Sequence, residues 1–299
     1  MSDNRFPPLA GLVIGILAAS TASTFIRLAQ GEMLSLAIAA WRLTLASLIL
    51  APFALALRWQ ELRSLTRQEW LLALASGALL ALHFASWITS LALTSVAASV
   101  VLVSTNPLFV GVASYFLFKE RPGRAMVVGL IVAVAGSAVI GLGDLGQGQD
   151  SLVGDLLALL GGMAGAGYFL IGRRLRARLS LLGYVFPVYS TAAVLLMALA
   201  LITGAPLTGH STVTWLWLLL LALGPQIVGH SSLNWALRHL TATYVTLAAL
   251  GEPIGSALLA LLVLGEPPTL AALVGGGLIL AGIAIASQSN ISTDHRAEK

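Results

Sequence analysis

The sequence predicts an all-α membrane protein of ten transmembrane helices, arranged as two inverted five-helix repeats. Three observations predict this fold: the composition, a succession of apolar runs, and a five-span unit that occurs twice. Of the 299 residues, 58% are hydrophobic and only 9% are charged, whereas a soluble domain carries roughly 25% charged residues. The apolar runs follow one another with short breaks, so no soluble domain of useful size fits between them.

The apolar runs define the predicted spans, because about 20 apolar residues cross a hydrocarbon core roughly 30 Å thick. Proline and glycine inside several spans are common in membrane helices. In order, the predicted spans are Leu9 to Ala29, Leu34 to Leu57, Trp70 to Leu93, Val96 to Phe118, Ala125 to Leu142, Leu152 to Ile171, Leu181 to Ile202, Val213 to Leu237, Thr241 to Leu264 and Leu270 to Ala286.

The first run resembles a signal peptide in part, because Arg5 precedes it and AASTAS at 18–23 offers small residues. The apolar run continues through Phe25 and Ile26, however, whereas the apolar part of a secretory signal is shorter. A retained first span is therefore favoured.

The distribution of lysine and arginine predicts the orientation, since these residues accumulate in short cytoplasmic loops. With the N-terminus inside, 14 of the 16 lysines and arginines fall in inner segments and none in outer loops; Arg27 and Arg42 lie within spans. We therefore expect a multi-pass protein of the bacterial inner membrane with both termini in the cytoplasm. The inner residues are Arg5, Arg58, Arg63, Arg67, Lys119, Arg121, Arg124, Arg173, Arg174, Arg176, Arg178, Arg238, Arg296 and Lys299.

The repeat is visible when the second half is laid on the first with a shift of 146 residues, called the repeat shift below. It predicts repeats at 1–144 and 145–299. Because five spans are an odd number, the second copy enters the membrane in the opposite orientation. The basic loop KERPGR thus corresponds to GEPPTL, which has no lysine or arginine. The matched pairs are Pro107 with Pro253, Glu120 with Glu266, Pro122 with Pro268, Gly129 with Gly275 and Gly136 with Gly282.

Inverted repeats are a recurring design of secondary transporters, with the substrate site near mid-membrane at the repeat interface. Two related halves of opposite orientation can exchange conformations and so yield inward-open and outward-open states. In this reading Glu120 and Glu266 mark helix ends, which is favoured over a role in substrate binding.

The same stretches carry a family resemblance. The sequence ALTSVAASVVLVSTNPLF at 92–109 with FKERP at 118–122, and the stretch WALRHLTAT at 235–243 with EP at 252–253 and LGE at 264–266, resemble the two copies of the EamA domain in the drug/metabolite transporter superfamily. Within it, the chain looks most similar to bacterial exporters of aromatic amino acids. The resemblance covers nearly the whole chain. It implies ten helices and export of small metabolites through a central cavity.

Two helices have a proline near the middle of their span. Pro107 and Pro253 lack the N–H that would bond the carbonyl four residues earlier, so a kink is expected in each helix. The polar neighbours Ser104, Asn106 and Glu252 favour a break that lines a cavity over a simple packing kink. We therefore take these five residues as candidate substrate-binding positions.

Glu252 is the sharpest single candidate. A carboxylate at the centre of a membrane helix costs about 2.5–3.5 kcal/mol on insertion scales, so it normally faces a wet cavity or a partner. A protonated or arginine-paired structural glutamate remains the alternative.

Two helices carry polar stripes. His83, Ser86, Trp87 and Ser90 lie at offsets 0, 3, 4 and 7, and Gln226, His230 and Asn234 at offsets 0, 4 and 8, each on one helix face. Such stripes can also be interhelical hydrogen bonds alone, worth about 0.6 kcal/mol each. Two equivalent stripes favour a polar pocket that contains His83, His230, Asn234 and Trp87.

Arg42 lies about eight residues into its span, too deep to reach the interface easily. It is expected to pair within the protein, with Glu252 as one partner, or to attract a substrate carboxylate. Tyr168 and Tyr189 are further candidates for the cavity wall. The aligned glycines of the fifth and tenth spans indicate close packing within a monomer or a homodimer face.

Other functions are disfavoured by the motifs. GLGDLG at 141–146 matches a phosphate-binding fingerprint and a protease motif, but the first requires a soluble βαβ unit and the second paired aspartates inside the membrane. Two histidines are weak grounds for a metal site. We expect no enzyme activity, no cofactor and no nucleic-acid partner, and we expect a transporter whose substrates are amino acids, aromatic ones included. A channel, or a carrier of other metabolites or drugs, remains the alternative.

Overall fold

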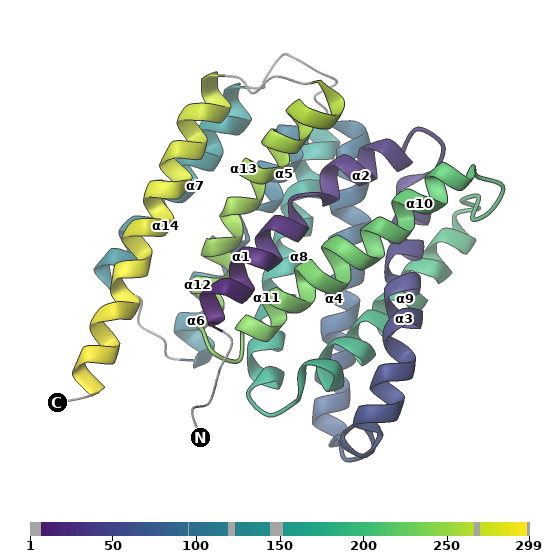
Figure 1. The fold of residues 1–299 in the computed structure, drawn as a ribbon, viewed down its shortest axis with the longest axis horizontal. Helices are drawn as coiled ribbons and strands as arrows, with labels where there is room; N and C mark the ends of the chain where they lie inside the picture. Colours follow the sequence, from purple (N-terminus) through teal and green to yellow (C-terminus); the bar gives the residue numbers. More distant parts are fainter. Residues whose placement is uncertain (1–6, 95, 119–122, 144–151, 266–269, 298–299) are drawn as a thin grey trace.

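The computed structural model describes residues 7–94, 96–118, 123–143, 152–265 and 270–297, and these form a bundle of helices with no strand among them (Figure 1). The first half contains α1 (Pro8–Ala19), α2 (Ala22–Ala29), α3 (Ser35–Arg63), α4 (Arg67–Leu93), α5 (Val96–Val103), α6 (Asn106–Phe118) and α7 (Arg124–Gly143). The second half contains α8 (Leu152–Arg176), α9 (Leu181–Ile202), α10 (Thr212–Leu221), the π-helix η1 (Ala222–His230), α11 (Ser231–Ala236), α12 (Ala242–Ala248), the 3₁₀ turn η2 (Ala249–Gly251), α13 (Glu252–Leu259), the π-helix η3 (Ala260–Leu264) and α14 (Leu270–Ala297).

Each of the ten predicted ranges contains helix within the described residues. Seven helical stretches there are long and apolar enough to cross a membrane. They are 8–29, 35–63, 67–93, 152–176, 181–202, 212–236 and 242–263. The multi-pass membrane fold is therefore confirmed, whereas the count of ten spans stays a prediction. Helix α3 extends beyond the predicted end at Leu57 to Arg63, because a helix satisfies its own backbone and can continue into water.

The short connections begin helices with side-chain caps. Thr66 accepts a hydrogen bond from the Glu69 N–H, and the Glu69 side chain accepts one from the Thr66 N–H, which completes a capping box at α4. Ser180 caps α9 and Ser211 caps α10 in the same way, with serine oxygens accepting from backbone N–H groups. These caps place the turns between spans at the polar segments of the sequence.

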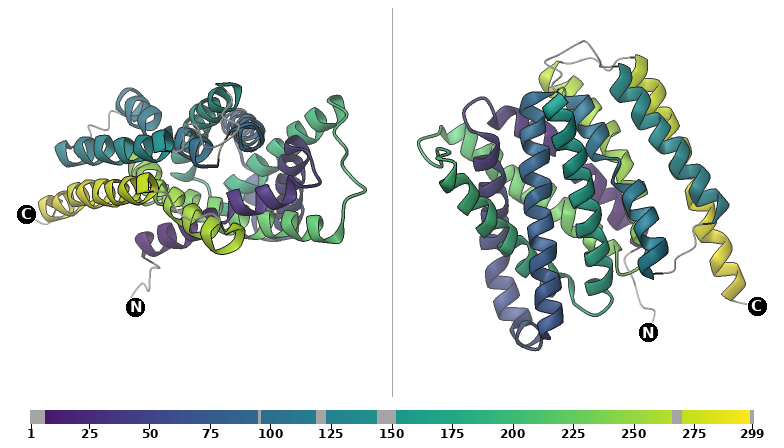
Figure 2. Two further views of the ribbon diagram at one scale, coloured as in Figure 1. Left: turned by 90° about the horizontal axis from the view of Figure 1, so that it is seen from above. Right: turned by 180° about the vertical axis from the view of Figure 1, so that it is seen from behind.

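Helices α7 and α14, which correspond under the repeat shift, lie side by side in Figures 1 and 2. A Cβ on Gly129 would be 2.5 Å from the Gly282 carbonyl oxygen, and a Cβ on Gly136 would be 2.6 Å from that of Gly275. The residue numbers rise along α7 as they fall along α14, so the two helices are antiparallel. The repeat shift maps each of these contacts onto the other, which is the geometry expected when one module is used in two opposite orientations.

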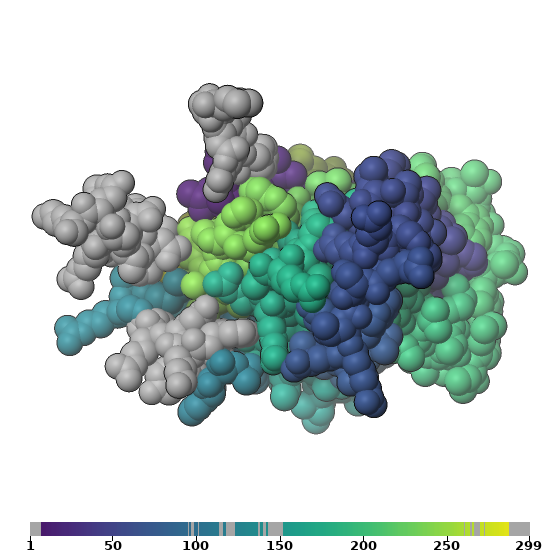
Figure 3. All heavy atoms as spheres, turned by 90° about the horizontal axis from the view of Figure 1, so that it is seen from below, coloured from purple at the N-terminus to yellow at the C-terminus, as the bar shows by residue number. Residues whose placement is uncertain are grey.

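One end of the bundle collects basic residues. The N-terminal end of α1, the α3–α4 turn, the α8–α9 turn and the α11–α12 turn lie at this end (Figure 1), and Figure 3 views the molecule from that side. The arginines of these described segments are Arg58, Arg63, Arg67, Arg173, Arg174, Arg176, Arg178 and Arg238. The loop that carries Glu120 and its counterpart with Glu266 lie outside the described residues.

A polar contact ties the two halves together at each end. Glu32 follows α2, and its carboxylate accepts hydrogen bonds from the Thr214 hydroxyl at 2.7 Å and the Ser211 N–H at 3.0 Å. These hydrogen bonds lower the pKa of Glu32 below its ordinary value of 4.5, and the bond from Thr214 has the largest effect. At the other end Arg178 follows α8 and pairs with Glu69. Position 178 is the counterpart of Glu32 under the repeat shift, so the two ties share one equivalent position; the other partners lie within a few residues of equivalent positions.

Candidate functional site

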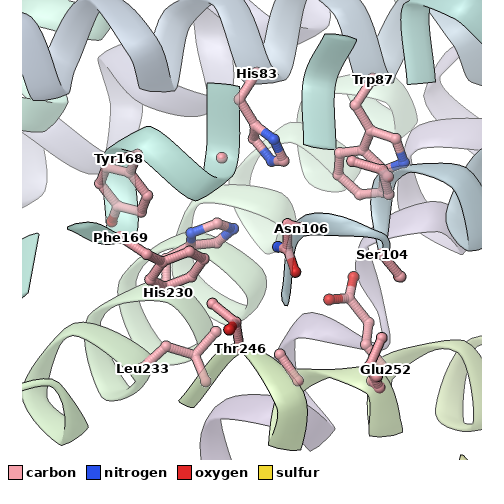
Figure 4. A pocket seen from close by; sticks show the side chains of 14 residues that line it. His83, Trp87, Ser104, Asn106, Tyr168, Phe169, His230, Leu233, Thr246 and Glu252 are labelled. Atoms are coloured by element: carbon pink, nitrogen blue, oxygen red, sulfur yellow. The ribbon is translucent and has the colours of Figure 1, made fainter. Parts of the chain in front are cut away.

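A cavity of about 50 Å³ lies where the two broken helices meet α4, α8 and η1–α11 (Figure 4). This volume has room for a few water molecules. Both halves of the chain contribute to the wall, which consists of His83, Trp87, Val103, Ser104, Asn106, Gly165, Tyr168, Phe169, His230, Leu233, Thr246, Ala249, Leu250 and Glu252.

The two helix breaks lie where the prolines predict them. Helix α5 ends at Val103 and α6 begins at Asn106, while α12 gives way to the 3₁₀ turn η2 before α13 begins at Glu252. Pro107 and Pro253 are buried as the second residues of α6 and α13 and do not line the cavity. Their contribution is to the backbone, because each removes a helical hydrogen bond at the break.

Under the repeat shift Asn106 corresponds to Glu252, and both side chains point into the cavity (Figure 4). Two equivalent positions of the repeats therefore face one space, with an amide in one and a carboxylate in the other. In the described part of the structure, no hydrogen bond or ion pair is formed by the Glu252 carboxylate. This acidic group is thus available to a cationic or hydrogen-bonding ligand.

The backbone at Glu252 is held by a third broken helix. Helices α1 and α2 are interrupted at Ser20 and Thr21. The Ser20 hydroxyl lies 2.8 Å from the Ile16 carbonyl of its own helix and 3.3 Å from the Glu252 carbonyl, and the Ser256 hydroxyl donates to the Ser20 carbonyl at 3.1 Å. The start of α13 is thereby fixed against the α1–α2 break. The sequence reasoning missed this break because no proline marks it.

The two histidines stand together on the wall, with ring centroids 6.3 Å apart. His83 Nδ1 donates to the Gly161 carbonyl at 2.8 Å, which fixes this ring and leaves Nε2 for other partners. His230 Nδ1 has no partner. No group of three histidine or acidic side chains that would hold a metal ion occurs among the described residues.

Aromatic side chains form the apolar part of the wall. The ring of Trp87 stacks on His83 with centroids 5.9 Å apart, and Tyr168 packs against Phe169 at 5.1 Å. Asn234 stands behind this wall, because its amide donates to the Tyr168 hydroxyl and to the His230 carbonyl. Asn234 therefore positions two wall residues and does not itself line the cavity.

Arg42 also lies outside the wall, fully buried in α3. Its Nε donates to Gln226 Oε1 at 2.9 Å, and its guanidinium carbon is 4.1 Å from the centroid of the Phe84 ring. The pairing with Glu252 that the sequence suggested is not formed: no ion pair joins these two side chains. Tyr189, another sequence candidate, bonds the Ser231 hydroxyl at 3.2 Å and does not line the cavity.

The structure thus brings seven of the sequence candidates to one cavity: His83, Trp87, Ser104, Asn106, Tyr168, His230 and Glu252. The sequence reasoning missed seven others, namely Val103, Gly165, Phe169, Leu233, Thr246, Ala249 and Leu250. The repeat carried a signal for two of them, because Leu233 is the counterpart of Trp87 and Leu250 is the counterpart of Ser104. Phe169 and Gly165 follow only from packing.

The apolar helices and the polar cavity between the two halves are features of a multi-pass membrane protein with a central polar site, as transporters have. Family comparison then identifies the group: the model of the EamA-like transporter family matches residues 8–142 and again residues 152–288. The chain therefore belongs to the EamA-like transporter family, within the drug/metabolite transporter superfamily, and is a membrane transporter of small molecules.

A solved structure has the same fold. Its title, "Crystal structure of protein", names no function; it is 23% identical to this chain, with a TM-score of 0.77, and the match covers 94% of this chain and 96% of the other. No curated protein matches the chain in sequence.

Proposed function

We propose that this transporter exports amino acids, aromatic ones included, by alternating access through the central cavity, with ten spans in two inverted repeats, 1–144 and 145–299. One observation carries the proposal: equivalent breaks of the two repeats present Asn106 and Glu252 to a single polar and aromatic cavity. The antiparallel contact of α7 with α14 supports the inverted arrangement.

Alternating access is supported by the size of the cavity. Pockets for small ligands usually measure about 300–1,000 Å³, whereas this cavity has about 50 Å³. An amino acid therefore requires helices to move apart before it enters. The ties of Glu32 and Arg178 at the two ends share one equivalent position of the repeat, which suits a cycle in which one end opens while the other stays closed.

The wall suits an amphipathic substrate. Glu252 and Asn106 offer oxygen acceptors to an ammonium group, while Trp87, Tyr168 and Phe169 offer aromatic surface to a side chain. The resemblance to exporters of aromatic amino acids points in the same direction. Export of other small metabolites or drugs through the same cavity is the second candidate.

The membrane assignment completes the proposal. The basic helix ends gathered at one end of the bundle favour a cytoplasmic location for that end and for both termini in a bacterial inner membrane. The working unit is a monomer or a homodimer.

Transport in reconstituted vesicles tests the proposal. Liposomes that contain the protein are loaded with unlabelled phenylalanine, and uptake of labelled phenylalanine, tryptophan and tyrosine is followed against protein-free liposomes. We expect uptake to be stimulated by substrate on the far side, as alternating access requires. Lack of uptake for all three amino acids would contradict the proposed substrates and favour other metabolites. Ohmic single-channel currents would show a channel and contradict the carrier mechanism.

A further inference from the structure

A second group of polar atoms lies behind the cavity wall, around Arg42. The Nη1 and Nη2 atoms of Arg42, the Nε2 atom of Gln226 and the Nδ1 atom of His230 are all buried without a hydrogen-bond partner. Buried polar atoms are normally bonded, and a buried guanidinium without an acid is especially costly. Several such atoms around one bonded pair indicate a place built for a ligand.

The geometry joins this group to the cavity. Gln226 Oε1 accepts from Arg42 Nε at 2.9 Å, so the bond leaves the Nη1–Nη2 edge of the guanidinium free. The Phe84 ring lies 4.1 Å from the guanidinium carbon on one side and has its centroid 5.2 Å from that of His230. His230 lines the cavity, whereas Arg42 and Gln226 do not. The polar group is therefore separated from the cavity by Phe84 and His230, which contact each other.

The local backbone explains why Gln226 points at Arg42. Pro225 lies inside the nine-residue π-helix η1, Ala222–His230, where the regular α-helical bonding is lost. A π-helical segment in an otherwise α-helical span frequently marks a functional site. Here it brings Gln226 to the guanidinium and His230 to the cavity wall from the same segment.

We propose that Arg42 and Gln226 form a carboxylate-binding subsite, which an opening of the cavity at His230 and Phe84 makes accessible to the transported molecule. The planar edge of a guanidinium matches the two oxygens of a carboxylate, and the Gln226 amide nitrogen offers a further donor. The inference rests on the proposed transport function and names the chemical group that the substrate carries. Glu252, on the wall of the cavity, then takes the cationic end of a zwitterion.

Matched ligand pairs test the subsite on the purified full-length protein. Thermal stabilisation is titrated with phenylalanine against phenylalaninamide, and with 3-phenylpropionate against 3-phenylpropionamide. We expect each carboxylate to bind at least about tenfold more tightly than its amide, because only the carboxylate accepts two bonds from Arg42. Equal affinity of acid and amide in both pairs would overturn the proposal.

Two variants locate the effect. Gln226→Glu places a carboxylate of the chain itself beside Arg42, so we expect the protein to fold, to melt at a higher temperature, and to lose the preference for acids. Arg42→Lys keeps the positive charge but removes the two-nitrogen edge of the guanidinium, so it should reduce the preference for the acid over the amide. A Gln226→Glu protein that folds and still prefers acids by the wild-type ratio would refute the subsite.

Arg176 provides the matched control, since it is also buried but its bonds are made, with Nε donating to the Asn234 carbonyl at 3.0 Å. Arg176→Lys should lower the melting temperature and leave the preference for acids unchanged. An equal loss of preference in this variant would show that any buried arginine has the effect and would count against the subsite.

Two further titrations distinguish a carboxylate of the substrate from a free anion as the ligand of the subsite. Sodium acetate and sodium chloride are titrated alone, and then with phenylalaninamide. Stabilisation by 3-phenylpropionate alone assigns the subsite to the substrate, whereas stabilisation by acetate that also promotes phenylalaninamide binding assigns it to a free anion; either supports the recognition of an anion at Arg42. Arg42-dependent binding of 3-phenylpropionate without any amino-acid uptake in vesicles would refute the proposed function and leave the subsite standing.

Discussion

The contact between α7 and α14 makes a quantitative prediction about Gly129→Ala. The added methyl carbon would be 2.5 Å from the Gly282 carbonyl oxygen and 2.8 Å from the Ala286 Cβ. Carbon atoms pack best at about 3.5–4.0 Å, so the two helices must separate by about 0.7 Å or more. Because the obstacle is backbone on the facing helix, no side chain can turn away to make room.

Overpacking of this kind costs about 1–3 kcal/mol, so we expect Gly129→Ala to lower the free energy of unfolding by that amount. The assay is unfolding of the purified protein in mixed micelles by increasing amounts of a denaturing detergent, followed by circular dichroism. The reciprocal substitution Gly282→Ala, whose Cβ would be 2.5 Å from the Gly129 carbonyl oxygen, should have a similar cost.

The double variant is a sharper test. Both methyl groups enter one contact, and helices already separated by the first accept the second more easily. The double cost should therefore be smaller than the sum of the single costs. Gly277→Ala is the control. Gly277 lies in α14, as Gly282 does, but its added Cβ would have no atom within 4 Å, so this substitution should be nearly neutral. A Gly129→Ala protein as stable as Gly277→Ala would refute the packing argument.

Three further predictions concern the cavity and the contact of Glu32 with Ser211 and Thr214 at one end of the bundle. Glu252→Gln removes the charge at constant shape; we expect a folded protein with strongly reduced uptake, and unchanged uptake over a range of pH would remove Glu252 from the mechanism. Gly165→Ala, whose Cβ would be 3.0 Å from His83 Nδ1, should push that ring into the cavity and raise KM, while Gly167→Ala, which meets only Leu79, should leave KM unchanged. The carboxylate of Glu32 has a lowered pKa, so its contribution to stability is present above the ordinary value of 4.5 and is lost as the pH falls through the lowered pKa. Thermal melts between neutral and acidic pH should show less acid sensitivity in Glu32→Gln than in the wild type, and equal sensitivity would contradict the assignment.

The helix breaks show what the sequence can specify. Pro107 and Pro253 act on their own helices, so the breaks beside them follow from the local sequence. The α1–α2 break has a local part, because the Ser20 and Thr21 hydroxyls bond back to the Ile16 and Ala18 carbonyls, and a long-range part, because the Ser256 hydroxyl of α13 donates to the Ser20 carbonyl. Long-range bonds of this kind leave no periodic or compositional mark, and the sequence reasoning placed one unbroken helix there.

Arg42 illustrates the same limit for side chains. Its depth in the second span indicated a need for a partner, and Glu252 was the natural choice by charge. The structure instead gives it Gln226 and the face of Phe84. Which of two polar side chains meets an arginine depends on the rotation of three helices about their axes. The repeat and the composition do not determine these rotations.

The two repeats differ in the residues that they place at equivalent positions around the site. Under the repeat shift Glu252 corresponds to Asn106, His230 to Phe84 and Arg42 to Val188. The helix breaks and the glycine contact of α7 with α14 are kept in both copies. Each charged group has an uncharged counterpart: Arg42 lies in the first copy and Glu252 in the second. A scaffold with an acidic group in one half and a basic group in the other suits the zwitterionic substrate that we propose, because a molecule with opposite charges at its two ends would bind there in one orientation.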